Sequence, residues 1–362
     1  MRKLLTELCH PKQWKTIASK DLLSQGYPVY GANGLIGYWR DYNHNSDVLT
    51  IGCRGTCGAL NIIGGKSYIN GNAMCLDELS HDIYIRYLYY YLRWYDLRKI
   101  ITGTTIPQIT IQGLQKVWVD YPSIKKQSEI VYVLDKVNLI IDYYQQQLQK
   151  LDDLVKARFV EMFGIPFVND KHWVTKCIGE VVTEVRYGTS RPAVEGGKYP
   201  YLRMNNLTND GEIDLNNLKY IDIPDDEVEK CIVRKGDVLF NRTNSAELVG
   251  KTAMFDLDEE MIIAGYIIRV RLQSCLRPEI LSQYMNLKPV KELLHSMAKG
   301  AVNQANINAQ ELQRIEVYIP HIELQREFVA FKKQLDKSKF VVQQALDKAQ
   351  LLFDSLMQQY FG

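Results

Sequence analysis

Polar side chains that can read DNA gather in glycine-containing segments of this chain, between its short apolar stretches. Arginine can make paired hydrogen bonds to guanine, and asparagine or glutamine can make them to adenine. Lysine, threonine and backbone amides beside glycine suit contacts with phosphates. Each candidate could instead be a turn or capping residue, so the base contacts are a hypothesis about the set. The candidates are Asn33, Arg54, Thr56, Lys66, Thr104, Gln108, Arg203, Asn205, Asn241, Arg242, Asn244, Lys251 and Gln304.

The sequence lacks the motifs of enzymes that modify or cut nucleic acids. It has no Asn-Pro-Pro-Tyr or Asp-Pro-Pro-Tyr to grip a target adenine, and no glycine-rich cofactor loop after a strand. It also has no phosphate-binding loop of the Gly-x-x-x-x-Gly-Lys-Ser/Thr type. The acidic run Asp225-Asp226-Glu227 near Lys230 has the wrong spacing for a nuclease site. We therefore expect no catalysis by this chain alone.

Metal ligands are not grouped along the sequence either. The seven cysteines are scattered and never form Cys-x-x-Cys, and the six histidines are isolated from one another. Cys53 and Cys57 could be imagined as ligands, but no histidine lies near them in the sequence. We expect reduced, mostly buried thiols and no metal site.

Length and composition indicate a folded protein with more than one core. The chain has 362 residues, of which 46% are hydrophobic and 24% charged. Its net charge of +2 neither demands nor forbids binding to nucleic acid. No apolar run approaches the roughly 20 residues that cross a bilayer, and Glu7 and His10 interrupt any signal-like start. We expect a cytoplasmic location.

A shift of 198 residues superimposes two long parts of the chain. It relates Ile109 through Gly164 to Ile307 through Gly362 without a gap. Upstream of this match, Trp14 corresponds to Trp173. Other short motifs recur in the same order in both copies, at distances along the chain that change from one motif to the next. The chain therefore reads as module, helix, module, helix. The shift preserves Leu114/Leu312, Val119/Val317, Pro122/Pro320, Ile124/Ile322, Gln127/Gln325, Glu129/Glu327, Gln145/Gln343, Leu148/Leu346 and Lys150/Lys348.

Each repeat ends in a long amphipathic segment. Residues 123–163 contain no glycine or proline, and apolar residues alternate by four and three as a coiled-coil seam requires. Two helices of about 40 residues, each about 60 Å long, are predicted to pair antiparallel, with the modules at opposite ends. Long helices inside one large globule are the alternative. Lys332 and Lys339 interrupt the second seam, and the predicted seam residues are Leu134, Val137, Ile141, Leu148, Leu335, Val342, Leu346 and Phe353.

The modules combine short strands with turn-rich loops. One helix, roughly Asp82 to Ile101, carries seven aromatic residues, most of which we expect in the core. The predicted fold class is α+β, with two globular α/β domains separated by two long antiparallel coiled-coil helices in a pseudo-two-fold internal repeat. The predicted boundaries are 1–122 and 165–320 for the globular domains, and 123–164 and 321–362 for the helices.

Several motifs together carry a resemblance to a known family. They are the loops Gly103-Thr-Thr-Ile-Pro-Gln and Gly300-Ala-Val-Asn-Gln, the segment Tyr27-Pro-Val-Tyr-Gly-Ala-Asn-Gly with Arg54-Gly-Thr-Cys-Gly, and Leu239-Phe-Asn-Arg-Thr-Asn-Ser with Val249-Gly-Lys-Thr. With the paired helices, they make nearly the whole chain resemble the specificity subunit of Type I restriction-modification systems. The second module is longer than the first, and the stretch before Trp14 is short, which leaves open how a circular arrangement would close.

The resemblance implies a function and partners. Residues 1–122 and 165–320 would be target recognition domains, each reading one half of a split DNA target. The chain would be a non-catalytic subunit that binds no cofactor itself. It would direct adenine-N6 methylation by two modification subunits that carry S-adenosylmethionine. Two restriction subunits, translocase-nucleases that use ATP and Mg, would add DNA cleavage.

Two other classes of function remain open from the residues alone. One is a scaffold without a role for DNA, in which a helical rod displays two protein-binding or sugar-binding domains. The other is a standalone enzyme such as a nuclease, which the missing motifs disfavour. Salt-dependent binding to duplex DNA would distinguish the first alternative, because phosphate contacts make affinity fall steeply with ionic strength.

Overall fold

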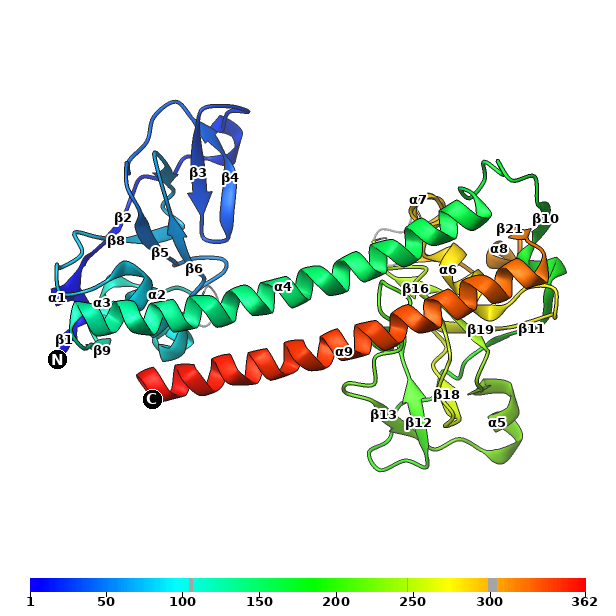
Figure 1. The fold of residues 1–362 in the computed structure, drawn as a ribbon. Coiled ribbons are helices and arrows are strands. Elements are labelled where there is room, and N and C mark those ends of the chain that lie inside the picture. The colour runs from blue at the N-terminus through cyan, green and yellow to red at the C-terminus, as the bar shows by residue number, and fades with distance from the viewer. Residues whose placement is uncertain (104–106, 246, 299–304) are drawn as a thin grey trace. The chain divides into compact units, whose positions relative to one another are not determined.

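The chain forms two compact units in a computed structural model, which describes residues 1–103, 107–245, 247–298 and 305–362. The first unit combines Met1–Gln146 with Val342–Gly362, and the second unit holds Gln147–Val341. Each unit contains strands, short helices and one half of each long helix, α4 (Ile124–Phe163) and α9 (Ile322–Phe361) (Figure 1). The predicted α+β class with two domains is confirmed.

The first unit is built mainly from short strands. Its strands are β1 (Arg2–Leu4), β2 (His10–Gln13), β3 (Tyr27–Gly31), β4 (Gly34–Trp39), β5 (Val48–Gly52), β6 (Leu60–Ile63), β7 (Tyr68–Ile69), β8 (Ala73–Asp77) and β9 (Trp118–Asp120). Its short helices are α1 (Leu5–Leu8), α2 (Ile85–Tyr95), α3 (Ile111–Leu114) and the 3-10 turns η1 (Ser19–Asp21) and η2 (Leu97–Ile100).

The second unit has more elements than the first. Its strands are β10 (Val174–Cys177), β11 (Val182–Tyr187), β12 (Tyr199–Leu202), β13 (Lys219–Ile221), β14 (Ile232–Val233), β15 (Val238–Asn241), β16 (Thr243–Asn244), β17 (Thr252–Met254), β18 (Met261–Ile263), β19 (Ile267–Leu272), β20 (Ala305–Asn306) and β21 (Glu316–Ile319). Its short helices are η3 (Ile178–Glu180), η4 (Met204–Asn206), α5 (Asp225–Cys231), α6 (Pro278–Met285), α7 (Lys288–Met297) and α8 (Ala309–Gln313).

The two modules share one strand plan. A four-stranded antiparallel sheet has the order β2-β8-β5-β6 in the first unit and β11-β19-β15-β17 in the second, which has another four-stranded sheet of order β13-β12-β18-β14. A parallel pair forms part of the next sheet in each case, β3 with β7 and β12 with β18. An antiparallel pair, β1 with β9 or β10 with β21, joins the start of each module to the strand before its long helix. The repeat in the sequence is therefore a repeat of the fold.

A buried glutamine ties the start of each long helix to its module. In the first unit, Gln127 Nε2 donates to the carbonyls of Asp82 (2.8 Å) and Pro122 (2.9 Å), and its Oε1 accepts from the amide of Tyr84. In the second, Gln325 Nε2 donates to the carbonyls of Cys275 (2.9 Å) and Pro320 (2.7 Å), and its Oε1 accepts from the amide of Arg277. Both side chains are fully buried. These bonds give a physical reason why the 198-residue shift preserves the pair.

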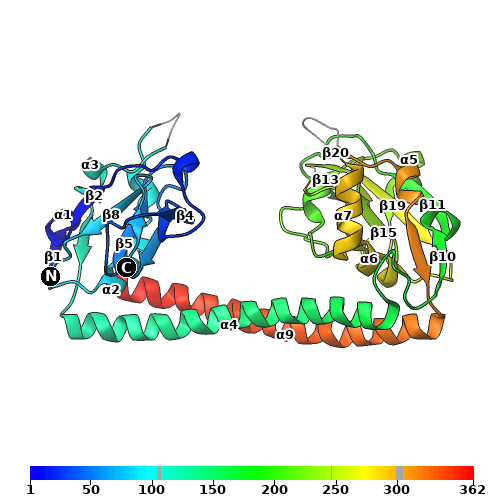
Figure 2. The same cartoon turned by 90° about the horizontal axis from the view of Figure 1, so that it is seen from above.

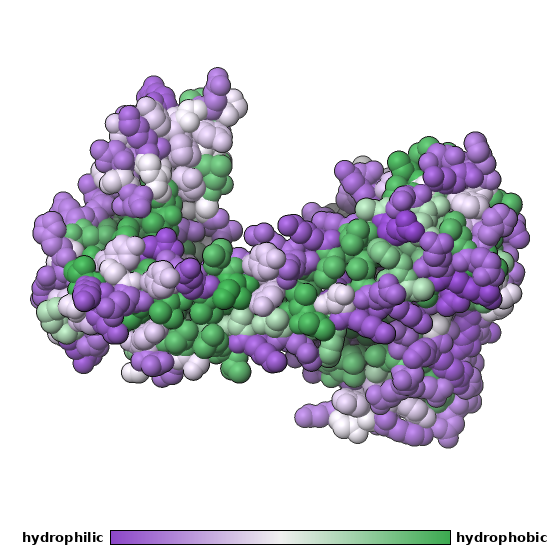
Figure 3. Space-filling view, viewed as in Figure 1, coloured by the Kyte–Doolittle hydropathy of each residue, from purple (hydrophilic) through white to green (hydrophobic). Residues whose placement is uncertain are grey.

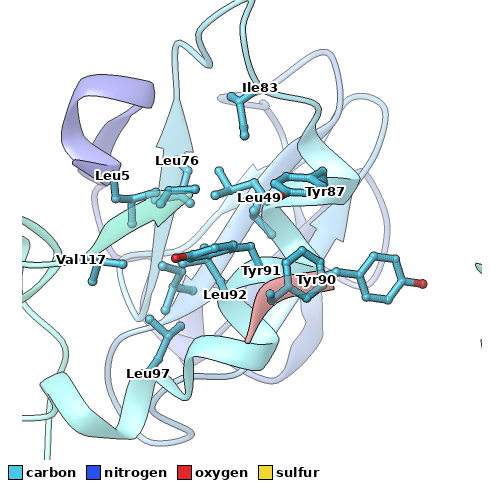
Figure 4. Close-up of a cluster of buried hydrophobic side chains, with 14 of the residues drawn as sticks. Leu5, Leu49, Leu76, Ile83, Tyr87, Tyr90, Tyr91, Leu92, Leu97 and Val117 are labelled. Carbon is cyan, nitrogen blue, oxygen red and sulfur yellow. The ribbon is translucent and has the colours of Figure 1, made fainter. Parts of the chain in front are cut away.

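The aromatic helix of the first unit is shorter than predicted. The expected helix from Asp82 to Ile101 is wrong at both ends, because α2 covers only Ile85–Tyr95 and Asp96 adopts a left-handed conformation at φ 58°. The 3-10 turn η2 follows. Three aromatic residues of α2 are buried as predicted, and Figure 4 shows them among the aliphatic side chains of the core: Tyr87, Tyr90 and Tyr91.

None of the predicted seam residues is exposed, and all but Leu148 and Val342 lie in or against the core of a unit. The core of the first unit contains residues from the first half of α4 and the last half of α9, while the second unit contains the complementary halves. The helices therefore run antiparallel within each unit, and within each unit, taken by itself, the sheets lie on one side of that unit's helix segments (Figure 2). Leu134, Val137, Ile141 and Phe353 are buried, whereas Leu148, Leu335, Val342 and Leu346 are half-buried.

The two lysines that interrupt the seam have acidic partners. Lys339 of α9 forms an ion pair with Asp152 of α4, and the Lys339 side chain is only 22% exposed. Lys332 pairs with Asp336 one turn further along the same helix. In the first unit the equivalent positions of the repeat are Leu134 and Ile141, both buried. The helix pair is thus apolar at these positions in one unit and charged in the other.

An ion-pair network supports the main sheet of the second unit. Arg269 is fully buried on β19 and binds Glu184 Oε2 at 2.7 Å, while Arg271 binds Glu184 and Asp237 at 3.0 and 2.9 Å. Burial raises the pKa of Glu184, but the hydrogen bond from Arg186 and the charges of both arginines lower it overall. Glu184 is therefore held as a carboxylate that neutralises buried positive charge.

Candidate nucleic-acid interface

Loops of the first unit converge on Arg54. Arg54 forms a β-bridge with Gln108, and Gln108 forms a second bridge with Thr102. The Cys57 thiol, in the loop that carries Arg54, donates to the Pro107 carbonyl at 3.1 Å. Arg54 and Thr56 are exposed, and Gln108 is half-buried. Three of the predicted DNA contacts therefore come together, although they lie about 50 residues apart in the chain.

The missing side chain of Gly52 lets a further turn join this cluster. A Cβ at Gly52 would lie 2.3 Å from the Thr56 carbonyl oxygen and 3.1 Å from that of Ala32. The 2.3 Å contact is shorter than real Cβ atoms show, so any other residue would force the Thr56 carbonyl to move, which favours glycine here. Ala32 precedes Asn33 in the exposed turn between β3 and β4. Asn33 therefore lies at the same end of the module as the Arg54 loop.

Lys66 lies elsewhere in the first unit. Strands β3 and β7 run parallel with Val29 opposite Tyr68. Asn33 follows the end of β3, whereas Lys66 precedes the start of β7, so the two are at opposite ends of the strand pair. The exposed Lys66 ammonium lies 5.2 Å from the centre of the Tyr42 ring. Lys66 is thus separate from the cluster that holds Arg54.

In the second unit, three predicted residues line one concave pocket. Arg203, Asn205 and Arg242 surround it together with Tyr266 and the segment from Thr189 to Ala193. The Arg242 guanidinium lies 4.8 Å from the centre of the Tyr187 ring and donates to the Gly265 carbonyl at 3.5 Å. Two guanidinium groups and an exposed amide in one hollow suit phosphates or the guanine and adenine edges.

Sequence reasoning did not single out the aromatic and cationic neighbours of this pocket. Tyr266 is 50% exposed, and Tyr187, which stacks with Arg242, is 42% exposed. Arg191 lines the pocket but forms a two-pronged ion pair with Glu227 at 3.0 and 2.7 Å. That hydrogen-bonded pair raises the pKa of Arg191. Exposed tyrosines beside arginine-rich loops are the signal that could have marked the pocket.

Tyr201 holds the wall of the same pocket. Its hydroxyl donates to the carbonyls of Thr189 (3.2 Å) and Arg191 (3.1 Å). Burial raises the pKa of Tyr201, so the hydroxyl stays protonated and remains a donor. The segment that carries Arg191 is therefore fixed on β12, the strand after which Arg203 and Asn205 follow.

Asn241 has a structural role, which corrects the prediction that it contacts DNA. Its side chain has no exposed surface. Its Nδ2 donates to the Met204 carbonyl at 3.5 Å, and its Oδ1 accepts from the Thr243 amide at 3.2 Å. Because buried amides must be hydrogen-bonded inside the fold, this side chain is not available to a base.

The remaining predicted residues of the second unit are less clearly placed for contact. Asn244 is half-buried in β16, and Lys251 is half-buried at the start of β17, outside the pocket lining. Burial lowers the pKa of nearby Lys291 to about 8; the charge of Asp210 opposes this shift, and that of Lys251 adds to it. Thr104 and Gln304 fall outside the described residues.

Each unit has a short antiparallel backbone pairing beside its candidate DNA-binding loops. In the first unit Arg54 pairs with Gln108, and in the second β16 pairs with β20, which sets Thr243 against Asn306 and Asn244 against Ala305. The backbone arrangement is therefore repeated while the side chains on it differ.

The six histidines are isolated from one another in the sequence, but His44 lies close to two other potential metal ligands in the structure. Its Nε2 lies 2.9 Å from Asp77 Oδ1, and the Cys75 thiol is close to both. Residues 31 to 33 apart in sequence meet here because a loop folds over strand β8, which no sequence spacing indicated.

The family model described as the Type I restriction modification DNA specificity domain matches residues 2–153 and 170–348. The chain belongs to this family. Among its relatives is the EcoKI type I restriction enzyme specificity subunit of Escherichia coli (strain K12), 23% identical over 286 residues, which cover 73% of this chain and 61% of that protein. The EcoBI type I specificity subunit of Escherichia coli is 23% identical over 376 residues, 94% of this chain and 75% of that protein.

Solved structures of type I systems have the same fold. The S subunit of a type I restriction-modification system from M. genitalium matches with a TM-score of 0.58 and 17% identity, covering 100% of this chain and 96% of that one. A chain from a structure of type I R-M complex assembly matches with a TM-score of 0.56 and 15% identity. The match with this chain covers less than two thirds of the length of some curated relatives. It covers 61% of the EcoKI subunit and 39% of a relative from Methanocaldococcus jannaschii. Within the described ranges, no helix is long and apolar enough to cross a membrane.

Proposed function

We propose that this chain reads a two-part DNA target in the cytoplasm and directs adenine-N6 methylation by partner subunits. The first unit would read one half-site and the second unit the other. The observation that carries the proposal is the repeated strand plan with different side chains on equivalent loops. Arg54 lies opposite Gln108 at this place in the first unit, whereas in the second unit Thr243 lies opposite Asn306 and Asn244 opposite Ala305. Two domains that share a backbone fold but differ in their loop side chains suit a DNA target whose two halves differ in sequence.

The side chains available in each unit fit the edges of bases. Arg54 beside Gln108 offers one partner for guanine and one for adenine, and Arg203, Asn205 and Arg242 offer a similar set in the second unit. Each good bidentate pair discriminates against a wrong base by about 1–3 kcal/mol. Asn33 and Thr56 can add contacts with phosphates or bases around Arg54.

Partner subunits would dock on the long helices. Several apolar side chains on these helices are exposed, and some recur at the 198-residue shift: Tyr143 (56% exposed) with Val341 (63%), and Leu154 (46%) with Leu352 (51%). Figure 3 shows such hydrophobic residues at the surface of the helices. Exposed apolar groups of this kind mark protein interfaces. A docking surface present twice supports two copies of the same modification subunit.

The chemistry would belong to the partners. The modification subunits would bring S-adenosylmethionine, and a pair of restriction subunits would bring ATP and Mg for translocation and cleavage. This chain would recognise the DNA sequence and supply no catalytic residue, in keeping with a sequence that has no methyltransferase or nuclease motif.

Methylation sequencing of cells that co-express this chain with its modification subunit tests the proposal. We expect protection of a split, non-palindromic sequence. Arg54→Gln should relax one half-site only, and Arg203→Gln the other only, while Arg326→Gln, an exposed arginine on α9 that binds Glu323, should change neither. No gene-dependent split motif, together with salt-independent or absent DNA binding, would favour a scaffold instead.

The docking surface is tested separately by copurification. Leu154→Asp and Leu352→Asp should each reduce the number of modification subunits bound from two to one, because each variant damages one of two equivalent surfaces. Gln145→Asp and Gln343→Asp, exposed residues that the shift also preserves, are the matched controls. Loss of both subunits in either single leucine variant would contradict two independent surfaces.

A further inference from the structure

His44 is held in the first unit by polar atoms on both sides of its ring. Its Nε2 lies 2.9 Å from Asp77 Oδ1, and its Nδ1 lies 2.8 Å from Asn43 Oδ1. The orientation of the Asn43 amide is fixed, because Nδ2 donates to the Ile69 carbonyl (3.0 Å) and Oδ1 accepts from the Ile69 amide (2.8 Å). The imidazole is therefore oriented with Nδ1 as the donor to Asn43 and Nε2 directed at Asp77.

Cys75 completes a group of three different ligand types. Cys75 and Asp77 are two residues apart on β8, so their side chains lie on the same face of the strand. The ligand atoms of His44, Cys75 and Asp77 all lie within 4.8 Å of one another. Cys75 is fully buried, and the side chains of His44 and Asp77 are 12% and 16% exposed. One side of the group is thus closed by the core and the other reaches solvent.

The surroundings of Cys75 contain a donor without an acceptor. The Trp14 Nε1 is buried with no hydrogen-bond partner in the described parts of the chain. The Trp14 ring packs against the small buried cluster that contains Cys75. A thiolate at Cys75 would give that N–H the acceptor that it lacks.

We propose that His44 Nε2, Cys75 Sγ and Asp77 Oδ1 bind one divalent metal ion of the zinc class, a site in the first recognition module. Imidazole, thiolate and carboxylate are the ligands that zinc takes in proteins, and three protein ligands leave a fourth position to water. On binding, the Cys75 S–H bond breaks, its electron pair forms the bond to the metal, and the proton leaves to solvent. The proton shared between His44 Nε2 and Asp77 leaves as well, because the metal takes the Nε2 lone pair.

The geometry needs only a small contraction to bind the ion. At zinc–ligand distances of about 2.0–2.3 Å, tetrahedral ligand atoms lie about 3.3–3.6 Å apart. The Nε2–Oδ1 distance of 2.9 Å would open slightly, and the separations to Sγ, at most 4.8 Å, would close by about 1 Å. Side-chain rotation of His44 on its loop can supply this. The Asn43 acceptor on the far ring nitrogen is the kind of second partner that metal-bound histidines have.

Among the residues that the structure describes, such a group of ligands occurs in the first module alone. In the equivalent sheet of the second unit, β19 carries Ile268 and Val270 side by side on one face, and both are buried in the apolar core. The second module does have a histidine packed on a tryptophan: Trp173 and His321 lie 5.6 Å apart at 85°, much as Trp14 and His44 lie 5.6 Å apart at 78°. His321 is therefore a matched control for a ring contact without a metal site.

Titration of the metal-free, reduced full-length chain with Co²⁺ tests the proposal. We expect one equivalent to bind with a thiolate-to-cobalt charge-transfer band and intense tetrahedral ligand-field bands, which Zn²⁺ then displaces with release of protons. Cys75→Ser should abolish the charge-transfer band, and Asp77→Asn and His44→Gln should each weaken binding at least tenfold. Asn43→Ala should weaken it about 10- to 100-fold, because the second partner of the ligating histidine is lost.

Two control variants and one direct measurement decide the outcome. His321→Gln and Cys9→Ser, a buried cysteine in the core of the same unit, should bind Co²⁺ as the unaltered chain does. If Cys75→Ser does not fold, X-ray absorption of the unaltered zinc-loaded chain should show one sulfur neighbour and otherwise nitrogen or oxygen. No charge-transfer band in the unaltered chain, a band that survives Cys75→Ser, or two sulfur neighbours would each overturn the assignment.

Discussion

Replacing Gln325 with methionine would remove the three hydrogen bonds that join the start of α9 to the second module. Methionine has a similar length and fills the same buried space, so the change is mainly one of polarity. The amide of Arg277 and the carbonyls of Cys275 and Pro320 would lose their partner in the interior. Gln127→Met would do the same in the first unit.

The size of the effect follows from the number of groups left without a partner. An intramolecular hydrogen bond contributes about 1 kcal/mol net, and a buried group left unsatisfied costs about 1–3 kcal/mol. Three bonds lost at once should therefore lower the free energy of unfolding of that unit by about 3–5 kcal/mol. Because Gln127 and Gln325 make the same three bonds, the two variants should lose similar amounts, each in its own unit.

Hydrogen exchange measured by mass spectrometry reports the two units separately, which a single melting curve does not. In Gln325→Met the peptide containing Arg277 should exchange at least about a hundredfold faster, while the peptide containing Tyr84 keeps its rate. The pattern should reverse in Gln127→Met. Gln145→Met and Gln343→Met, at exposed positions that the shift also preserves, should change stability by less than about 0.5 kcal/mol. A loss below about 1 kcal/mol, or faster exchange in the wrong unit, would refute the reasoning.

Three further substitutions test the Arg54 loop, the ion-pair network of the second unit and the helix seam. Gly52→Ala places a Cβ 2.3 Å from the Thr56 carbonyl oxygen, so calorimetry should show a loss of about 1–3 kcal/mol, and methylation sequencing a defect in the first half-site only. Glu184→Gln leaves Arg269 without its nearest anionic partner and should cost about 3 kcal/mol at neutral pH. Since the pKa of Glu184 is lowered in the fold, the unaltered chain loses this stabilisation as the pH falls through that lowered value, and urea titrations should show a weaker acid dependence in the variant. Ile141→Lys buries an ammonium in the apolar seam and should destabilise the first unit by several kcal/mol in the same titrations.

Local features of the sequence were sufficient for the long helices and the repeat. The absence of glycine and proline over 40 residues and the alternating apolar spacing predict α4 and α9, and the structure has them as single helices. Arg54, Thr56 and Gln108 were among the thirteen candidates read from the sequence, but only the bridge between Arg54 and Gln108 in the fold brings them together. The constant shift also pointed to Gln127 and Gln325, although their bonds could not be read from it.

Other features depend on tertiary contacts that no spacing reveals. Asn241 lies in a polar run typical of a loop, yet its strand is central in the sheet and buries it. Lys66 follows two glycines as a loop residue should, but the parallel pairing of β3 with β7 carries it to the other end of the module from Asn33. The cluster around His44 forms because a loop crosses β8, which joins residues more than 30 positions apart.

The charged interruption of the seam bears on which helices pair. A chain with two similar helices could in principle pair α4 with another α4, or α9 with another α9. The antiparallel arrangement sets Lys339 against Asp152, and the shift of 198 makes Ile141 and Gln350 the equivalent positions in the first unit. A pair of two α4 helices would set Asp152 against Ile141, and a pair of two α9 helices would set Lys339 against Gln350. Both of these pairings leave a partly buried charge without its counterion. The Lys339–Asp152 ion pair therefore favours the pairing of α4 with α9, while the apolar residues supply most of the attraction between the helices.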